Sequence, residues 1–239
     1  MLSAISQELA ISILQQVKPL RQNASGIENL GYGWIYYGLI RSLKPKHTLV
    51  IGSGYGFTPI VCAIGHKDNE YGRVTFVDPG YAGLIQGQGV GKWKDPNAIN
   101  NLTAQFSVGK FLTHYKMRND EFFPSYHLPS IDIAIIDGSH DYRNAKYDIA
   151  HCALHLSKDG LLILHDSDAF ANDIGFYGVR EAIRNANLHF VNIPGFAGLA
   201  ITQPNGGGFP NERISNLTKA SIIALLLFGF GWYLGKRNS

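Results

Sequence analysis

The 239-residue chain is 45% hydrophobic and 16% charged, which indicates a folded protein with a sizeable core and excludes a disordered one. Its length suits one α/β domain with an appendage better than two full domains. The net charge of +3, without a dense stripe of Lys and Arg, argues against a nucleic-acid partner.

The N-terminal segment predicts an amphipathic helix and no signal peptide. Residues 1–20 lack a basic start and a continuous apolar block. Apolar residues instead recur every three or four positions, at Leu2, Ile5, Leu9, Ile13 and Val17. We expect a helix within residues 1–24 that closes near Pro19, and a second helix at Trp34–Ile40.

A glycine-rich turn follows the first predicted strand, Leu49–Ile51. Its glycines stand at alternate positions, Gly52, Gly54 and Gly56, and an apolar helix is predicted at Thr58–Ile64. Glycines permit a sharp strand-to-helix turn and leave no Cβ where a ligand must touch the backbone. The helix aims free N–H groups and its positive dipole end at such a ligand. The position of the glycines between strand and helix predicts a nucleotide-type ligand.

The second predicted strand, Val74–Asp78, ends in a carboxylate. An acid some 20–25 residues beyond a glycine turn is suitably placed to accept hydrogen bonds from ribose hydroxyls. The alternative is an aspartate that caps the next turn, helped by Pro79–Gly80. After it, Pro79–Pro96 is rich in glycine and proline and shows little periodicity, which is typical of a lid over a site.

The remaining elements alternate between strand and helix. This alternation predicts an α/β fold with a doubly wound, mostly parallel sheet, in which ligands bind beyond the carboxyl ends of the strands. The predicted helices are Asn97–Phe106, Asp141–Leu156, closed by Gly160, and Val179–Ala186. The predicted strands are Phe111–Met117, Ile131–Ile136, Leu161–Leu164, Phe190–Asn192 and Gly198–Thr202.

A second polar cluster follows two of these strands, which we expect to be neighbours. Asp137 and His140 follow one strand, and His165 and Asp166 follow the next. Carboxylate and imidazole ligands from adjacent strand ends can converge on a divalent cation, and a carboxylate-rich set favours Mg²⁺. His140 is suited to act as a general base beside the ion. The alternative for each residue alone is a helix N-cap or a satisfied surface group.

These residues resemble a known family. Leu49–Gly56 resembles motif I of the class I S-adenosylmethionine-dependent methyltransferases, and Phe76–Asp78 is similar to their ribose-binding second strand. Ile136–Tyr142, together with Leu161–Asp166, resembles the metal-dependent O-methyltransferase branch that includes macrolide- and cephalosporin-tailoring enzymes. The likeness covers residues 25–202.

The resemblance implies a Rossmann-like methyltransferase fold of seven strands, with the last strand antiparallel. It implies S-adenosylmethionine at the glycine turn, a Mg²⁺ ion on Asp137, His165 and Asp166, and His140 as base. The residues it implies for the cofactor are Gly52, Ser53, Gly54, Tyr55, Gly56, Asp78, Arg118, Asn119 and Asp137.

The chain departs from the family pattern at two positions. Val50 stands where many relatives carry an acid, and His165 stands where the metal-binding pair usually has glutamate.

The C-terminal segment changes character. A methyltransferase domain at 25–204 is followed by a glycine-rich linker at 205–219 and a hydrophobic helix at 220–235. Fifteen uncharged residues give about 22 Å of helix, short of the roughly 30 Å hydrocarbon core. Flanking lysines and the interfacial aromatics Trp232 and Tyr233 favour a membrane contact. The alternatives are a buried C-terminal helix or a dimer contact, and the sequence leaves a homo-oligomer open.

Two other functions remain open. One is an NAD-dependent oxidoreductase, although a dinucleotide turn normally has its third glycine three residues after the second, where this chain has Phe57. The other is a catalytically inactive methyltransferase fold that binds a partner at a membrane. For the enzyme, the acceptor is a small molecule or a glycan. The cytosolic methyl donor and the apolar surroundings of Cys62 and Cys152 predict a cytoplasmic catalytic domain.

Overall fold

A computed structural model describes residues 15–18, 30–80, 95, 97–168, 178–195 and 197–204. Its centre is a seven-stranded sheet in the order β3-β2-β1-β4-β5-β7-β6. The first five of these strands are parallel, and β7 is antiparallel to both of its neighbours. The strands are β1 His47–Ile51, β2 Arg73–Val77, β3 Leu112–Tyr115, β4 Ile131–Ile136, β5 Leu156–His165, β6 Phe190–Ile193 and β7 Leu199–Thr202. The expected mostly parallel sheet with an antiparallel last strand is confirmed.

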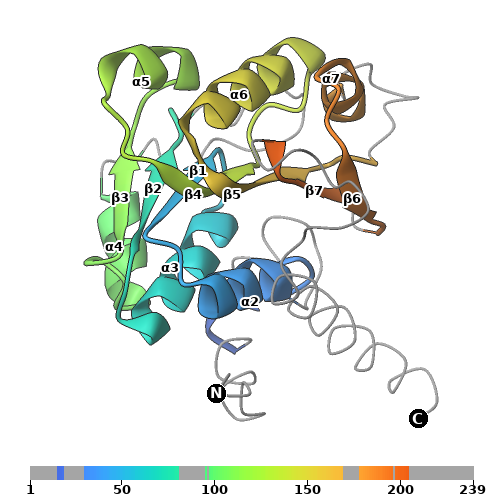
Figure 1. Cartoon of the computed structure of the whole chain (residues 1–239). Helices are drawn as coiled ribbons and strands as arrows, with labels where there is room; N and C mark the ends of the chain where they lie inside the picture. Colours follow the sequence, from blue (N-terminus) through green and yellow to red (C-terminus); the bar gives the residue numbers. More distant parts are fainter. Residues whose placement is uncertain are drawn as a thin grey trace, which may run out of the picture.

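Helices cover both faces of the sheet. Figure 1 shows α5, α6 and α7 together on one side and α2, α3 and α4 on the other. The helices are α2 Gly33–Leu43, α3 Phe57–Asn69, α4 Ala98–Gln105, α5 Asn119–Ser125, α6 Tyr142–His155 and α7 Val179–Asn185. This is the doubly wound arrangement that alternating strands and helices predict.

Each face of the sheet packs its own hydrophobic layer. β1 is buried along its whole length, so its side chains alternate between the two layers. Val50 packs with α2 and α3, whereas Leu49 and Ile51 pack with α6 and α7. Burial on both faces explains why the central strands are continuous apolar runs rather than alternating patterns.

Two parts of the chain differ from the expectation. The helix α6 matches the expected Asp141–Leu156 to within one residue at each end, but Gly160 does not close it, because β5 begins at once with Leu156, which pairs with Ile131. The segment after β3 continues into the short helix α5, which the sequence pattern did not predict. The added part of β5 lies at the amino end of the sheet, and α5 follows β3, so neither difference moves the carboxyl ends of β4 and β5.

Several expectations fall on residues outside the described ranges. Of the helix expected within 1–24, residues 15–18 are described, and they are helical. Most of the expected lid, the linker at 205–219 and the hydrophobic helix at 220–235 lie outside. Across the residues that the structure describes, no helix has both the length and the apolar character needed to span a bilayer.

Candidate functional site

The predicted site residues come together at one edge of the sheet. β1, β2, β3, β4 and β5 are mutually parallel, so their carboxyl ends share that edge. Ligands of open α/β sheets bind at such an edge. The glycine turn follows β1, Asp78 follows β2, and the histidine and carboxylate cluster follows β4 and β5.

The glycine turn needs glycine for more than one reason. A Cβ on Gly52 would lie 2.3 Å from the Cα of Gly138, so the turns after β1 and β4 touch through their backbones. Gly52 also has a φ of +74°, which side chains rarely adopt. A Cβ on Gly54 would meet nothing within 4 Å in the described structure. The turn therefore packs against β4 at Gly52 and opens outward at Gly54, where a ligand can approach the backbone.

Asp78 is tied to this turn. Its Oδ2 accepts a hydrogen bond from the backbone N–H of Ser53 at 3.0 Å, and its Oδ1 accepts one from the N–H of Gly80 at 2.7 Å. Burial raises the pKa of Asp78, and these two hydrogen bonds oppose the rise. Asp78 thus caps its own turn, as the alternative interpretation expected. Each carboxylate oxygen can accept a second hydrogen bond, so a ribose contact remains compatible with this arrangement.

Asp137 is held from two sides. Its backbone N–H donates to Ile51 O at 2.8 Å, which continues the β1–β4 pairing beyond the strands. The hydroxyl of Thr58, which is 2% exposed in the first turn of α3, donates to Asp137 Oδ2 at 2.7 Å. Sequence reasoning missed Thr58, because a hydroxyl within an apolar helix carries no periodic signal. The bond leaves Asp137 Oδ1 as the oxygen that faces the cluster.

The four residues of the second cluster meet in space. His165 Nδ1 lies 3.6 Å from Asp137 Oδ1 and 3.2 Å from Asp166 Oδ1. His140 Nε2 lies 2.7 Å from Asp166 Oδ2. One ligand atom each from Asp137, His140 and His165 falls within 4.8 Å of the others, an arrangement that can hold a metal ion. The prediction that β4 and β5 bring these side chains together is confirmed.

Asp166 is the centre of the cluster. Burial acts to raise its pKa, but hydrogen bonds from His140 and His165 outweigh burial and hold the pKa far below its usual range. Its backbone adopts a left-handed φ of 59°, an uncommon conformation for a residue other than glycine. Such backbone conformations cluster at functional sites. Asp166 is therefore an ionised carboxylate fixed between two imidazoles.

The aromatic residues before β1 belong mainly to the core. Tyr36 and Tyr37 are buried, and the Tyr37 hydroxyl donates to Asp68 at 2.9 Å. Tyr32 differs, because its ring lies edge-on to His165 with the centroids 5.6 Å apart. Its hydroxyl donates to Ile193 O, so Tyr32 packs against the cluster from α2.

Arg118 and Asn119 lie at the same edge, after β3, but their side chains face α6. The Arg118 guanidinium forms a two-pronged pair with Asp120 at 2.8 and 2.7 Å. The Asn119 side-chain amide donates to the carboxylate of Asp148 in α6. Their predicted cofactor contact remains a prediction, because no described contact joins either side chain to the glycine turn.

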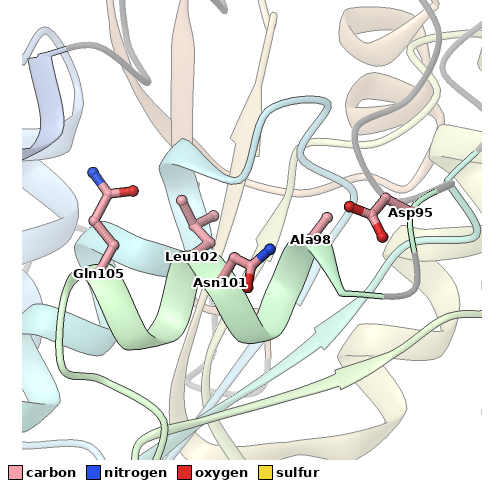
Figure 2. Close-up of a pocket in the computed structure, with 5 residues that line it drawn as sticks. All are labelled: Asp95, Ala98, Asn101, Leu102 and Gln105. Atoms are coloured by element: carbon pink, nitrogen blue, oxygen red, sulfur yellow. The ribbon is translucent and has the colours of Figure 1, made fainter.

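Two hollows lie outside the cluster. Figure 2 shows Asp95, Ala98, Asn101, Leu102 and Gln105 beside a cavity of about 230 Å³ along α4. Its volume is below the usual range for ligand pockets, and its amides and single carboxylate offer no catalytic group. A groove of about 520 Å³ runs between α5 and α6, with Arg118 and Asn119 among its lining residues.

Comparison with known proteins agrees with this geometry. Residues 49–167 match the model of a family described as a methyltransferase domain. No curated protein matches the chain. The matched segment runs from the glycine turn through the histidine and carboxylate cluster.

Solved structures share the fold. The cofactor-bound protein Rv0187 from MTB has a TM-score of 0.62 at 14% identity, covering 85% of this chain and 93% of that one. The O-methyltransferase from Bacillus cereus in complex with SAH has a TM-score of 0.58 at 14% identity, covering 83% and 92%. A putative caffeoyl-CoA O-methyltransferase from Staphylococcus aureus has a TM-score of 0.57 at 18% identity, covering 83% and 98%.

The motifs, the sheet topology and the family match all lead to one conclusion. The turn after β1, the acid after β2 and the strand order are those implied by the resemblance of the sequence. The match over residues 49–167 joins them in one domain. Residues 49–167 form a methyltransferase domain, in a chain that has the fold of the class I S-adenosylmethionine-dependent methyltransferases.

Proposed function

We propose that the protein transfers the methyl group of S-adenosylmethionine to a hydroxyl group of a small molecule or a glycan. One observation carries the proposal. Asp137 and Asp166 each have one carboxylate oxygen bonded to a neighbouring side chain, Thr58 or His140, and the other oxygen next to His165 Nδ1. This arrangement supports a cation-binding face and a candidate base beside the glycine turn.

The donor would lie along the carboxyl edge. Gly54 opens outward, and the N-terminus of α3 points its free N–H groups at the same space. Asp78 would accept hydrogen bonds from the ribose while keeping its bonds to Ser53 and Gly80. The Bacillus cereus structure, which contains SAH, has the same fold and supports this placement.

The cluster suits a divalent cation. Asp137 Oδ1, Asp166 Oδ1 and His165 Nδ1 are the three atoms that would hold it. Although His140 also lies within 4.8 Å of the Asp137 and His165 ligand atoms, we assign it to the base because its Nε2 contacts Asp166 Oδ2. Two carboxylate oxygens suit Mg²⁺ or Mn²⁺, whereas the imidazole nitrogen is a ligand more typical of metals such as Zn²⁺ and Fe²⁺. When bound, such an ion would lower the pKa of the acceptor hydroxyl and fix its direction.

His140 would act as the base. An Nε2–H donated to Asp166 makes Nδ1 the basic nitrogen, in the way that a carboxylate orients a catalytic histidine. The acceptor oxygen forms its bond to the methyl carbon as the carbon–sulfur bond breaks, and S-adenosylhomocysteine leaves. His140 takes the hydroxyl proton, so charge and atoms balance. The protein supplies alignment of the oxygen with the methyl group.

A ligand-binding screen tests the proposal. We expect S-adenosylhomocysteine to raise the melting temperature, NAD to leave it unchanged, and Mg²⁺ or Mn²⁺ to add a further shift. Profiling with labelled S-adenosylmethionine against hydroxyl-containing acceptors then identifies the substrate. A protein that binds NAD and not S-adenosylhomocysteine would contradict the proposal.

The C-terminal run at 220–235 extends the proposal to a membrane. It rests on the sequence alone, since these residues lie outside the described structure. We expect the full chain to float with anionic lipid vesicles in a density gradient and the Leu226→Glu variant to stay at the bottom. Equal flotation of both forms would contradict the membrane contact, and the catalytic domain would then be expected free in the cytoplasm.

A further inference from the structure

A buried acid that the proposed mechanism does not use lies in the middle of α6. Asp148 is only 1% exposed and shares the inner face of the helix with Ala145, Ile149 and Cys152. Burial, together with the charges of Asp141 and Asp120, raises the pKa of Asp148 to about 7, while a hydrogen bond from Asn119 opposes the rise. The position is one where an apolar residue would be expected.

The two oxygens of Asp148 have different surroundings. Oδ1 accepts a hydrogen bond from the side-chain amide of Asn119. Oδ2 is buried and has no hydrogen-bond partner among the residues that the structure describes. A buried polar atom without a partner destabilises a fold, and an apolar residue of similar volume would avoid that cost. An acid at this position is therefore better explained by its bond to Asn119 than by packing.

Asn119 is fixed by two hydrogen bonds. Its side-chain Oδ1 accepts from the backbone N–H of Asp120 at 2.9 Å, and its Nδ2 donates to Asp148. Asn119 is the first residue of α5, directly after Arg118. Asp148 therefore ties the turn at the end of β3 to α6, across 29 positions of sequence.

The turn after β3 lies next in line along the donor site. The sheet order β3-β2-β1 places the glycine turn first, Asp78 second and the Arg118–Asn119 turn third along the carboxyl edge. A donor whose sulfonium end lies near the cluster and whose ribose meets Asp78 would extend its base toward the third position. The shape of that turn then affects how tightly the donor binds.

We propose that Asp148 is a positioning residue for the methyl donor, which acts by holding Asn119 and with it the turn after β3. The inference rests on the proposed function, because it needs S-adenosylmethionine at this edge. Asp148 does not touch the donor. Its effect passes through the Asn119 amide.

Calorimetric titration with S-adenosylhomocysteine tests the proposal. We expect Asp148→Ala and Asp148→Leu to raise the dissociation constant about 3–10-fold, the range of one lost hydrogen bond. Asp148→Asn should stay within about twofold of wild type, because its amide oxygen still accepts from Asn119. The matched control is Ile149→Ala on the same face of α6, which should lower the melting temperature and leave the dissociation constant unchanged.

A double-mutant cycle identifies the route of the effect. In the Asn119→Ala background, Asp148→Ala should weaken binding no further, since the two residues act through one bond. Wild-type affinity in both Asp148→Ala and Asp148→Leu would overturn the inference, as would a full additional loss in the Asn119→Ala background. If wild type itself fails to bind S-adenosylhomocysteine, the proposed function fails first. Wild-type binding with unaffected Asp148 variants overturns only this inference.

Discussion

Histidines lie at both ends of the central sheet, buried at the amino end and half-buried at the carboxyl end, and their partners differ. At the amino end, His47 Nε2 lies 2.9 Å from the Thr75 hydroxyl, and His66 Nε2 lies 2.9 Å from the Thr48 hydroxyl. At the carboxyl end, both His140 and His165 contact Asp166. Hydroxyl partners and burial keep a histidine neutral, whereas carboxylate partners stabilise the charge that forms when it takes a proton. Under the proposed mechanism, histidines support the architecture at the amino end and carry out chemistry at the carboxyl end.

His140→Ala should produce the largest effect. We expect turnover to fall about 10²–10⁴-fold, the usual contribution of a general base, with the dissociation constant of S-adenosylhomocysteine unchanged. His66→Ala at the other end should instead lower the melting temperature, because it leaves Thr48 and the backbone O of Tyr71 without their partner. Radiometric assays of methyl transfer and thermal unfolding measure the two effects. Full turnover in His140→Ala would remove the distinction between the two ends.

Asp148→Asn sharpens the comparison, because Asp148 is a buried carboxylate that lacks the histidine partners of Asp166. In the described structure, neither a histidine nor another cation is bonded to Asp148. In the folded protein the pKa of Asp148 is about 7, above the usual aspartate value of 3.8, so the folded state binds the proton more tightly than the unfolded chain does. The stability that this difference contributes is fully present below pH 3.8. That stabilisation is lost as pH rises through 7. The variant cannot ionise, so its unfolding free energy should gain about 2 kcal/mol over wild type between pH 5 and pH 8.

Urea denaturation at several pH values measures the Asp148→Asn gain. Asp141→Asn is the control. Asp141 is half-buried at the start of α6, and although burial acts to raise its pKa, hydrogen bonds from Ser139 and Asn144 lower it, so this variant should show no comparable gain at high pH. A difference between Asp148→Asn and wild type that is constant with pH would show that Asp148 is ionised throughout.

Thr58→Val tests whether the carboxylate at residue 137 needs its hydroxyl donor. Valine keeps the shape of threonine but leaves Asp137 Oδ2 without its bond, so the carboxylate loses its fixed orientation. We expect about a 10-fold loss of turnover and weaker Mn²⁺ binding, measured by electron paramagnetic resonance. Thr58→Ser keeps the donor and should behave as wild type. Equal behaviour of the valine and serine variants would mean that the hydroxyl does not matter.

His66→Gln at the amino end should give the smallest effect. Burial lowers the pKa of His66 below 6.5, so as the pH falls this histidine takes up a proton in the unfolded chain before it does so in the folded protein. Wild type therefore loses stability below pH 6.5, at about 1 kcal/mol per pH unit, whereas glutamine does not titrate. The stability difference between wild type and the variant should shrink by about 1 kcal/mol between pH 6.5 and 5.5. A difference that stays constant would show that His66 does not titrate differently in the folded state.

Much of the fold was predictable because buried parallel strands are apolar on both faces. Leu49–Ile51 and Ile131–Ile136 could be recognised as strands from composition alone. The helix α5 was missed because it is short and contains Pro124, which normally interrupts helices. The first half of β5 was missed because Ser157–Gly160 is polar and resembles a turn. In the structure this segment continues β5, whose first residue, Leu156, pairs with Ile131 of β4.

The site was predictable where residues follow strands and unpredictable where helices supply them. Asp137 and Asp166 follow apolar runs, so topology alone brings them to one edge. Thr58 and Asp148 lie inside helices, where a polar residue normally faces solvent. Only the packing of α3 and α6 reveals that each contacts a residue of the site.

The contact between Gly52 and Gly138 has a consequence for anyone who would redesign this enzyme. A Cβ on Gly52 would lie 2.3 Å from the Cα of Gly138, so the contact admits no side chain at Gly52, whereas a Cβ on Gly138 would meet nothing nearer than 3.5 Å. Gly52 therefore sets how closely the glycine turn approaches the loop that begins with Asp137. Changes to acceptor preference have to spare Gly52, because a single added carbon there would push the glycine turn away from the loop that begins with Asp137.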